Sequence, residues 1–552
     1  MEDLEKNRFV RRLWEKDATL WKTEPKELLQ ISNSLGWLTV VDWMIPKLKE
    51  ITDFAVSIKS LGFKDVVLLG MGGSSLAAEL FRASLPSQEG YPALHVLDST
   101  DPDWIDNLEC SIHLSKTLFI YASKSGTTIE PASFFNYFYD RTNQKGEQFI
   151  AITDPGTFLE KFAKEKQFLK IFLNPPDIGG RFSALSYFGL VPAALGGKDI
   201  GALVKSAKSM MEQCQKDSVD KENPAVSLGS ALGELYKQGK DKLTFILPKS
   251  LETLGLWIEQ LIAESSGKDG KGLVPVVGEE LLDPKSYGKD RVFIRIKNSS
   301  PKLPSEENLW KKLGETHPLI EIEVPQPTDL GGEFIRWEIA TATACALMGV
   351  NAFDQPDVQL AKDQTKYILS RIVKEGGLTM EKPHYENEDF QMRMSRAAQK
   401  QVPLPPAEDP LNPLKTILKN AQPHQYIGLL AFLPNDSATE NTLNSMRNSL
   451  RTQTGLATLF GFGPRYLHST GQLHKGGPNH GLFILITKES KKPIPIPGEK
   501  YSFEELELAQ GVGDFQALEG KERPVIHFHL KAPFSKSLTS LSNKLCAHSS
   551  VG

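Results

Sequence analysis

Cysteine is scarce in this chain: among 552 residues there are four, and no two stand at the spacing of a CxxC pair or a zinc finger. This scarcity excludes a disulfide framework and a cysteine-based structural zinc site, and we expect no metal. An excess of positive charge is also missing, because 64 lysines and arginines stand against 68 aspartates and glutamates. We therefore expect no nucleic-acid partner.

Long hydrophobic runs are missing too. The most apolar stretch, residues 340–350, is too short to cross a bilayer, so no membrane partner is expected. The first residues, MEDLEKNRFVRRLWEKD, are charged and lack the apolar stretch of a secretion signal. These absences favour a cytoplasmic protein. At roughly one domain per 150 residues, the length suggests three or four domains.

Short apolar runs alternate with helix-length segments through the first part of the chain. They fall at residues 66–73, 94–100, 117–128, 148–154 and 168–174. The runs are nearly continuous rather than alternating, which is typical of parallel strands buried on both faces of a sheet. The sequence thus predicts N-terminal helices and a doubly wound α/β domain over residues 1–222.

The same alternation returns after a polar segment that contains a proline, residues 216–225. The apolar runs of this second part fall at residues 242–248, 273–278, 291–296 and 319–325. They predict a second doubly wound domain over residues 223–405, with a proline-rich joint at 401–413. Residues 406–552 have the pattern of a small α+β domain with a serine-rich, frayed tail after Pro533.

Two loops rich in glycine, serine and threonine follow strands of the first domain and open helices. They are residues 70–75, GMGGSS, and residues 123–128, SKSGTT. Glycine lets the backbone approach an anion closely, and the free N–H groups of a helix start bind phosphate. One such loop alone is often an ordinary tight turn, but two at neighbouring strand ends favour a phosphate site. Because Ser75 stands where a dinucleotide fingerprint needs glycine, and no GxxxxGK[ST] occurs, we expect a small phosphorylated metabolite.

Five segments, in this order, resemble the glucose-6-phosphate isomerase family: LLGMGGSSL, SKSGTTIE, IGGRFS, AESSGKDGKG and NAFDQPDVQLAKDQTK, between Leu68 and Lys366. The resemblance implies two sugar-isomerase (SIS) α/β domains that face each other, a phosphosugar substrate, and no organic cofactor. It also implies the interconversion of glucose 6-phosphate and fructose 6-phosphate through a cis-enediol. From about Tyr426 onward, the chain resembles the C-terminal extension on the isomerase half of bacterial transaldolase–isomerase fusions, without the transaldolase barrel.

The resemblance also implies substrate-binding residues, motif by motif. The positions that meet the substrate or its phosphate are Gly73, Ser74, Ser123, Lys124, Ser125, Thr128, Gly180 and Gln355. Two positions depart from the family pattern. Ser125 stands where threonine is common, and Gln359 stands where the family usually has glutamate.

Three charged residues would carry the chemistry in this family. Glu264 matches the base that moves a proton between C1 and C2, although an isolated glutamate is more often a solvated surface group. Arg181 would stabilise negative charge on the enediolate oxygen, unless it forms a structural ion pair. Lys362 would help to open the sugar ring. Lys366 lies one helical turn later on nearly the same face, and either residue is otherwise a solvated lysine; we favour Lys362.

A ring-opening histidine is expected between the base and the last lysine of the pattern. Only His317 lies there, and its surroundings, GETHPLIEI, do not match the family loop. The segment LHSTGQLHKGGPNH does contain an H-[ST]-x-G element. We therefore expect His468 to take this role, with His474 as second choice, because a histidine pKa of about 6.5 suits proton transfer to a ring oxygen. A loop histidine without catalytic duty is the alternative.

Two other functions stay open. A related isomerase acting on mannose 6-phosphate would use the same phosphate loops, since phosphate contacts do not read the stereochemistry at C2. A non-catalytic phosphosugar-binding protein would keep the loops without needing Glu264, and Gln359 leaves room for this alternative. The family resemblance also implies a dimer whose two subunits share active-site residues. We expect a homodimer, or a monomer if His468 is supplied from within the chain.

Overall fold

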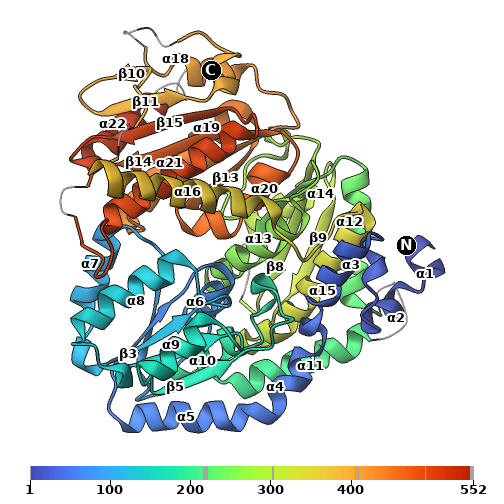
Figure 1. Cartoon of the computed structure of the whole chain (residues 1–552). Helices are drawn as coiled ribbons and strands as arrows, with labels where there is room; N and C mark the ends of the chain where they lie inside the picture. Colours follow the sequence, from blue (N-terminus) through green and yellow to red (C-terminus); the bar gives the residue numbers. More distant parts are fainter. Residues whose placement is uncertain are drawn as a thin grey trace.

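The described part of the chain forms three β-sheets, each with helices packed against it (Figure 1). The computed structural model describes residues 2–215, 222–300, 304–378, 380–404, 406, 409–490 and 493–546. The joints that the sequence predicts at 216–225 and 401–413 lie partly outside these residues. In the part of the chain that is described, no helix is long and apolar enough to cross a membrane.

The first sheet has five parallel strands in the order β2-β1-β3-β4-β5. They are β1 (Asp65–Leu69), β2 (Ala93–Leu97), β3 (Thr117–Ala122), β4 (Phe149–Thr153) and β5 (Lys170–Leu173). Alternate residues of β1 face two different cores, Val66 and Leu68 on one side and Val67 and Leu69 on the other. Burial on both faces explains the continuous apolar runs, and the predicted doubly wound α/β arrangement is confirmed.

Helices cover both faces of this sheet and form the N-terminal region. Those around the sheet are α5 (Leu48–Ser60), α6 (Leu76–Ser84), α7 (Pro102–Ser111), α8 (Ile129–Arg141), α9 (Phe158–Glu165) and α10 (Tyr187–Leu195). Ahead of them come α1 (Glu2–Lys6), α2 (Phe9–Trp14), α3 (Pro25–Ser32) and α4 (Val40–Met44).

The second sheet is also entirely parallel, with the order β7-β6-β8-β9. Its strands are β6 (Lys242–Ile246), β7 (Val274–Val276), β8 (Arg291–Lys297) and β9 (Leu319–Glu323). Its helices are α11 (Ile200–Cys214), α12 (Pro224–Lys237), α13 (Glu252–Ser266), α14 (Pro304–Gly314) and α15 (Leu330–Met348). One hydrophobic core runs from the first sheet through α10, α11, α13 and α15 to the second sheet. The two sheets are therefore packed as one body.

The third sheet is mixed, with the order β10-β11-β15-β14-β12-β13. Its strands are β10 (Tyr385–Glu386), β11 (Phe390–Met394), β12 (Tyr426–Ala431), β13 (Ala457–Phe462), β14 (Gly481–Lys488) and β15 (Val525–Leu530). We call this sheet and its helices the C-terminal unit. It differs from the small α+β domain that the sequence predicts, because β12 to β15 pair in parallel and only β10 and β11 are antiparallel additions. It also begins before residue 406, where the sequence places its start.

The serine-rich tail is folded, at least as far as residue 546. The helices of the C-terminal unit are α17 (Arg396–Gln399), α18 (Asn412–Lys419), α19 (Ser437–Thr454), α20 (Gly471–Gly476), α21 (Phe503–Gly520) and α22 (Phe534–Cys546). In α22, Leu538, Leu541 and Leu545 are buried in the core of this unit. The prediction of a frayed tail after Pro533 is therefore wrong for residues 534–546, because leucines at helical spacing anchor the helix.

The C-terminal unit packs against both of the other sheets. Its helix α21 shares a core with the first sheet, and Phe483 and Leu485 of β14 share a core with Val274 and Val276 of the second sheet. Helix α16 (Pro356–Glu375), which follows the second sheet in the sequence, lies across the C-terminal unit and packs along α21 (Figure 1). Because α16 contains most of the segment NAFDQPDVQLAKDQTK, this packing brings the last of the five family-like segments against the C-terminal unit.

Candidate active site

Several of the residues singled out by the sequence, among them Arg181, Glu264 and His468, meet where loops of the first sheet, helix α13 and the C-terminal unit come together. Three short 3-10 turns lie here: η4 (Gly72–Ser74) after β1, η7 (Gly180–Phe182) after β5, and η11 (Arg465–His468) after β13. Turn η4 contacts both η7 and η11, and α13 contacts η7. The junction thus draws on all three sheets.

Glycines let two of these turns touch through their backbones. A Cβ on Gly73 would lie 2.0 Å from the carbonyl oxygen of Gly180, so no larger residue fits. The hydroxyl of Ser183 donates to the carbonyl of Gly73 at 3.1 Å and ties the turns together. A Cβ on Gly180 itself would meet nothing within 4 Å, and Ser74 is partly exposed. The backbone of η7 therefore borders open space that a ligand can enter.

Arg181 follows Gly180 directly and is buried, with 3% of its side chain exposed. Its Nε donates to Ser265 Oγ at 2.8 Å, and its Nη1 donates to Gln355 Oε1 at 3.1 Å. Its Nη2 donates to the carbonyls of Ala352 at 2.6 Å and Asp354 at 3.0 Å. All three guanidinium nitrogens are held, so the positive charge is fixed in place.

Glu264 lies in the last turn of α13. Its Oε1 is 3.4 Å from Arg181 Nη1, and 11% of its side chain is exposed. One helical turn earlier, Gln260 donates from Nε2 to Glu264 Oε2 at 3.2 Å. The carboxylate is thus held from two sides and still reaches the junction. It is neither a solvated surface glutamate nor sealed inside a core.

His468 lies on the other side of Gln260. The same Nε2 of Gln260 that bonds Glu264 also donates to the carbonyl of His468 at 2.7 Å. His468 packs on Gly72, where a Cβ would lie 2.9 Å from the Cβ of His468. The ring nitrogen Nε2 of His468 is 3.0 Å from Oε1 of Glu130. A chain of hydrogen bonds therefore runs from Glu130 through His468 and Gln260 to Glu264.

Glu130 is a site residue that the sequence patterns did not single out, although it ends the segment SKSGTTIE. It lies in the first turn of α8 and is buried. Burial alone would raise the pKa of Glu130, but the charge and hydrogen bond of His468, together with the charge of Lys362, hold it below the ordinary value. Because an ionised carboxylate only accepts, the proton in this contact sits on Nε2 of His468. An acidic residue directly after a phosphate-loop motif was the available signal.

The two other candidate histidines have different surroundings. His474 is buried, its Nδ1 lies 3.1 Å from the hydroxyl of Tyr426, and burial lowers the pKa of His474 well below the ordinary value. His317 packs edge-on against Tyr287 and Phe293. The hydrogen-bond partners of the His317 ring are Thr316 and the carbonyl of Gly288. Of the three histidines, the structure brings His468 to the junction.

The SKSGTT loop lies between β3 and α8. Ser123 Oγ donates to Thr128 Oγ1 at 3.2 Å and accepts from the backbone N–H of Gly126 at 3.1 Å. Ser125 is exposed and Thr128 partly so. The ammonium of Lys124 does not turn toward these hydroxyls, because it bonds Asp154 and the carbonyl of Pro176. The next two residues lead to Glu130, so this loop is close to the chain of bonds that reaches Glu264.

Helix α16 presents the last predicted residues. Gln355, just before its start, is exposed on one side and bonds Arg181 on the other. Lys362 is exposed, and its charge reaches Glu130. Gln359 turns to Asp363, to which it donates at 2.7 Å. The departure from the family pattern therefore falls on the solvent side of α16.

A further cation is buried near Arg181. Lys268 donates to the carboxylate of Asp354 at 2.8 Å and has 2% of its side chain exposed. Burial, and then the charge of Arg181, lower the pKa of Lys268 to about 8. Two fixed cations make this side of the junction suited to an anion.

Parts of this chain are similar to known proteins. Residues 45–273 match the family model described as phosphoglucose isomerase. The chain is 29% identical over 375 residues to a probable glucose-6-phosphate isomerase of Methanococcus maripaludis, which covers 60% of this chain and 84% of that protein. It is 28% identical over 373 residues to a glucose-6-phosphate isomerase of Rubrobacter xylanophilus, covering 58% of this chain and 85% of the relative.

Two solved structures share the fold. A hypothetical protein from Thermus thermophilus superposes with a TM-score of 0.56 at 24% identity, over 66% of this chain and 94% of its own. A glucose-6-phosphate isomerase from Chlamydia trachomatis gives a TM-score of 0.51 at 20% identity, over 66% of this chain and 78% of its own. These matches leave about a third of the chain without a counterpart.

Proposed function

Because residues 45–273 form a phosphoglucose isomerase domain, we propose that this chain interconverts glucose 6-phosphate and fructose 6-phosphate. The single observation that carries the proposal is the meeting of a carboxylate, a fixed guanidinium and a histidine at one junction. Glu264 Oε1 lies 3.4 Å from Arg181 Nη1, and Gln260 links Glu264 to His468. Residues beyond 273 lie outside the family match, so their roles rest on geometry.

The proton transfer needs one carboxylate on one face of the sugar. In the aldose-to-ketose direction, Glu264 takes the proton from C2, the C1=C2 bond forms, and negative charge moves to O1. The enediolate takes up a proton at O1, O2 then loses its proton to become the carbonyl, and Glu264 returns its proton to C1. Arg181 stabilises the charged oxygen, because its position is fixed before the reaction begins.

The phosphate group has two loops to bind to. Ser123, Ser125 and Thr128 offer hydroxyls at the start of α8, where the helix N-terminus favours an anion. Gly73 and Ser74 offer backbone and hydroxyl groups from the neighbouring strand end. Since the ammonium of Lys124 is engaged by Asp154, we propose that it acts by its charge and not by direct contact.

Ring opening is proposed for His468, with Lys362 beside it. The Nε2 proton of His468 is directed at Glu130, which leaves Nδ1 to exchange a proton with the ring oxygen. Lys362 lies close enough to influence Glu130 and would bind the C1 hydroxyl.

A coupled assay with fructose 6-phosphate tests the base. Glu264→Gln is expected to lower kcat about 10²- to 10⁴-fold, because it removes the proton acceptor. In D₂O the wild type should incorporate deuterium at C1 and C2, and the variant should not. Phosphosugar binding, measured by calorimetry, should persist in the variant. Mannose 6-phosphate in the same assay tests the related specificity.

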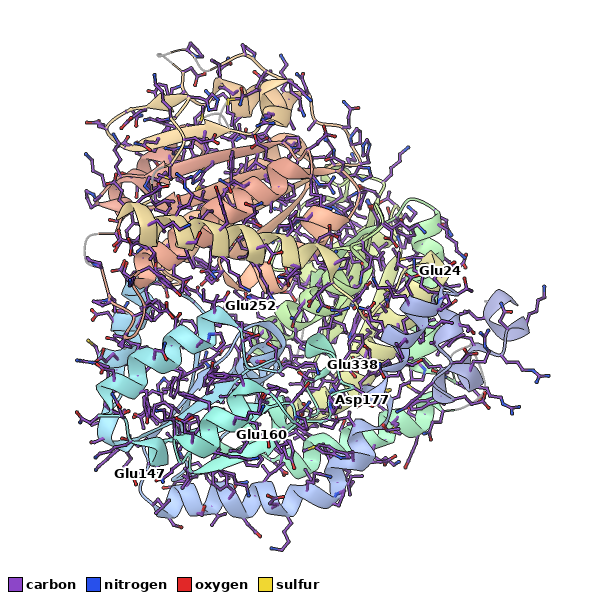
Figure 2. All side chains as sticks on the ribbon, in the orientation of Figure 1. Glu24, Glu147, Glu160, Asp177, Glu252 and Glu338 are labelled. Carbon is purple, nitrogen blue, oxygen red and sulfur yellow. The ribbon has the colours of Figure 1, made fainter. Side chains whose placement is uncertain are left out.

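Glu252→Gln is the matched control. Glu252, which is labelled in Figure 2, lies at the exposed start of the same helix and pairs with Lys249. It should leave kcat unchanged. Normal turnover by Glu264→Gln would remove Glu264 from the mechanism. Phosphosugar binding by the wild type without any turnover or deuterium incorporation would favour the non-catalytic alternative.

His468→Asn tests ring opening separately from proton transfer. Erythrose 4-phosphate cannot close a furanose ring, because its 4-hydroxyl carries the phosphate, so its isomerisation needs no ring opening. The variant should therefore lose turnover of glucose 6-phosphate and retain turnover of erythrose 4-phosphate. Equal losses on both substrates, or wild-type rates on both, would contradict the role of His468.

One chain is proposed to be sufficient for the site. His468 comes from the C-terminal unit of the same chain as Glu130 and Glu264, so no residue from a second copy is required by this arrangement. Light scattering combined with activity at rising dilution tests this. Full specific activity of a monomer is expected, and activity that vanishes as a dimer dissociates would contradict it.

A further inference from the structure

Gln510 of α21 is buried at the junction, with 2% of its surface exposed. Its Nε2 donates to Oε1 of Glu130 at 2.8 Å. This is the same carboxylate oxygen that lies 3.0 Å from Nε2 of His468. Gln510 and His468 thus share one oxygen of one buried carboxylate, although α21 and η11 are separate elements of the C-terminal unit.

The orientation of the Gln510 amide is fixed by the first sheet. Thr100, in the loop after β2, is fully buried and donates from Oγ1 to Gln510 Oε1 at 2.8 Å. Because an ionised carboxylate only accepts, Glu130 selects the amide nitrogen of Gln510, and the amide oxygen then accepts from the Thr100 hydroxyl. The amide is therefore not free to flip, and a donor always faces the carboxylate.

We infer that Gln510 is a positioning residue for His468: it holds the carboxylate of Glu130 in line with the ring and shares that oxygen's negative charge. The inference rests on the proposed ring-opening role of His468. It adds a residue far outside the family match, on a helix that carries none of the sequence motifs. Thr100 supports this arrangement, because its hydroxyl donates to the amide oxygen of Gln510.

The charged and polar groups around Glu130 determine in which direction the pH–rate profile should move when Gln510 is replaced. His468 from η11 and Lys362 from α16 stabilise its charge, and Gln510 from α21 adds a neutral donor. Arg465, three residues before His468, is occupied by Asp98 through two hydrogen bonds of 2.8 Å. If the donor of Gln510 is removed, Glu130 depends more strongly on His468. The imidazolium should then hold its proton more tightly.

Gln510→Met tests this, because methionine has a similar shape and no donor. The limb of the pH–rate profile that belongs to His468 should move to higher pH by about one unit, which is tenfold in proton affinity. The value of kcat for glucose 6-phosphate should fall by about tenfold at pH values below the shifted limb, with KM changing less than twofold. Turnover of erythrose 4-phosphate should stay at the wild-type rate.

Thr100 supplies a matched pair of variants that do not touch Glu130 or His468. Thr100→Val keeps the shape and removes the hydroxyl, so it frees the amide and should shift the same limb in the same direction by a smaller amount. Thr100→Ser keeps the hydroxyl and should leave the profile unchanged. This pair decides the question if Gln510→Met does not fold, as judged by its circular dichroism spectrum.

The outcomes distinguish failure of this inference from failure of the proposed ring-opening role of His468. Gln510→Met and Thr100→Val with an unshifted limb would overturn it, even if kcat fell evenly across the pH range, because an even loss indicates a structural role only. His468→Asn then shows whether the proposed ring opening stands by itself. A shifted limb in both variants, with Thr100→Ser unchanged, would support the inference.

Discussion

Arg181→Met is expected to lower kcat by about 10³-fold, and Arg181→Lys by about 10²-fold. The loss of one preorganised donor at a developing oxyanion costs about 10²- to 10³-fold in kcat. Methionine removes the charge as well as the donor. Lysine keeps a charge, but a single ammonium does not reproduce the planar fork that bonds Ser265, Gln355 and two carbonyls.

The hydrogen bonds of Arg181 also contribute to the stability of the folded protein. Arg181 bonds the carbonyls of Ala352 and Asp354, and orphaned buried acceptors cost about 1–3 kcal/mol each. Both variants should therefore unfold at lower temperature than the wild type, and Met more than Lys. The value of KM should change only a few-fold, because the proposed role of Arg181 is at the reacting carbons and not at the loops proposed to bind phosphate.

The assay is steady-state turnover of fructose 6-phosphate with the thermal melt of each variant measured beside it. A five-carbon aldonic acid phosphate, whose carboxylate presents negative oxygens where the enediolate does, should bind both variants more weakly than the wild type. A folded Arg181→Met variant that keeps kcat within tenfold of the wild type would refute the electrostatic role. So would unchanged binding of the aldonic acid.

Two further predictions concern a backbone contact and a buried acid. Gly73→Ala should lower kcat/KM by about 10²-fold, because its Cβ would lie 2.0 Å from the carbonyl oxygen of Gly180 and push the turns apart. Gly179→Ala, whose Cβ would make ordinary contacts starting at 3.6 Å, is the control that should keep its activity. Glu338, labelled in Figure 2, is fully buried, and burial raises its pKa well above 4.5. The unfolded chain loses this proton first, so the folded state loses about 1.4 kcal/mol of stability per pH unit as pH rises from 4.5 toward the raised pKa of the folded state. Glu338→Leu should remove this slope, and thermal melts across the range should show its advantage over the wild type growing with pH; a constant difference would contradict the reasoning.

The first two sheets were predictable because their signals are local. Continuous apolar runs mark strands buried on both faces, and glycine-rich loops mark the carboxyl ends of β1 and β3. The C-terminal unit was less predictable. Its serine-rich end hides Leu538, Leu541 and Leu545, whose helical spacing anchors α22. Whether strands pair in parallel depends on contacts between distant segments, which composition does not report.

The candidate site likewise has one part that local sequence signals indicate and another part that they do not. Glu264, Arg181 and the loops GMGGSS and SKSGTT lie within short motifs, so the resemblance of those motifs to a known family was enough to single them out. The partners of these residues are distant in sequence: His468 bonds Glu130 across 338 positions, and Gln510 does so across 380. These hydrogen bonds depend on how α21 and η11 pack against the first sheet. The element H-[ST]-x-G picked out His468, but nothing local indicated its carboxylate or the glutamine behind it.

The buried charges of the site also hold the parts of the molecule together. Arg181 from the first sheet faces Glu264 from the second, and Glu130 from the first sheet faces His468 from the C-terminal unit. Each pair joins two parts of the chain that have sheets of their own. Removal of one partner leaves a buried charge uncompensated, which costs about 3–5 kcal/mol. The C-terminal unit therefore has one favourable position on the other two sheets, and that position is the one that places a histidine beside the carboxylate. Docking and chemistry depend on the same contacts, so a variant that loosens one should weaken the other.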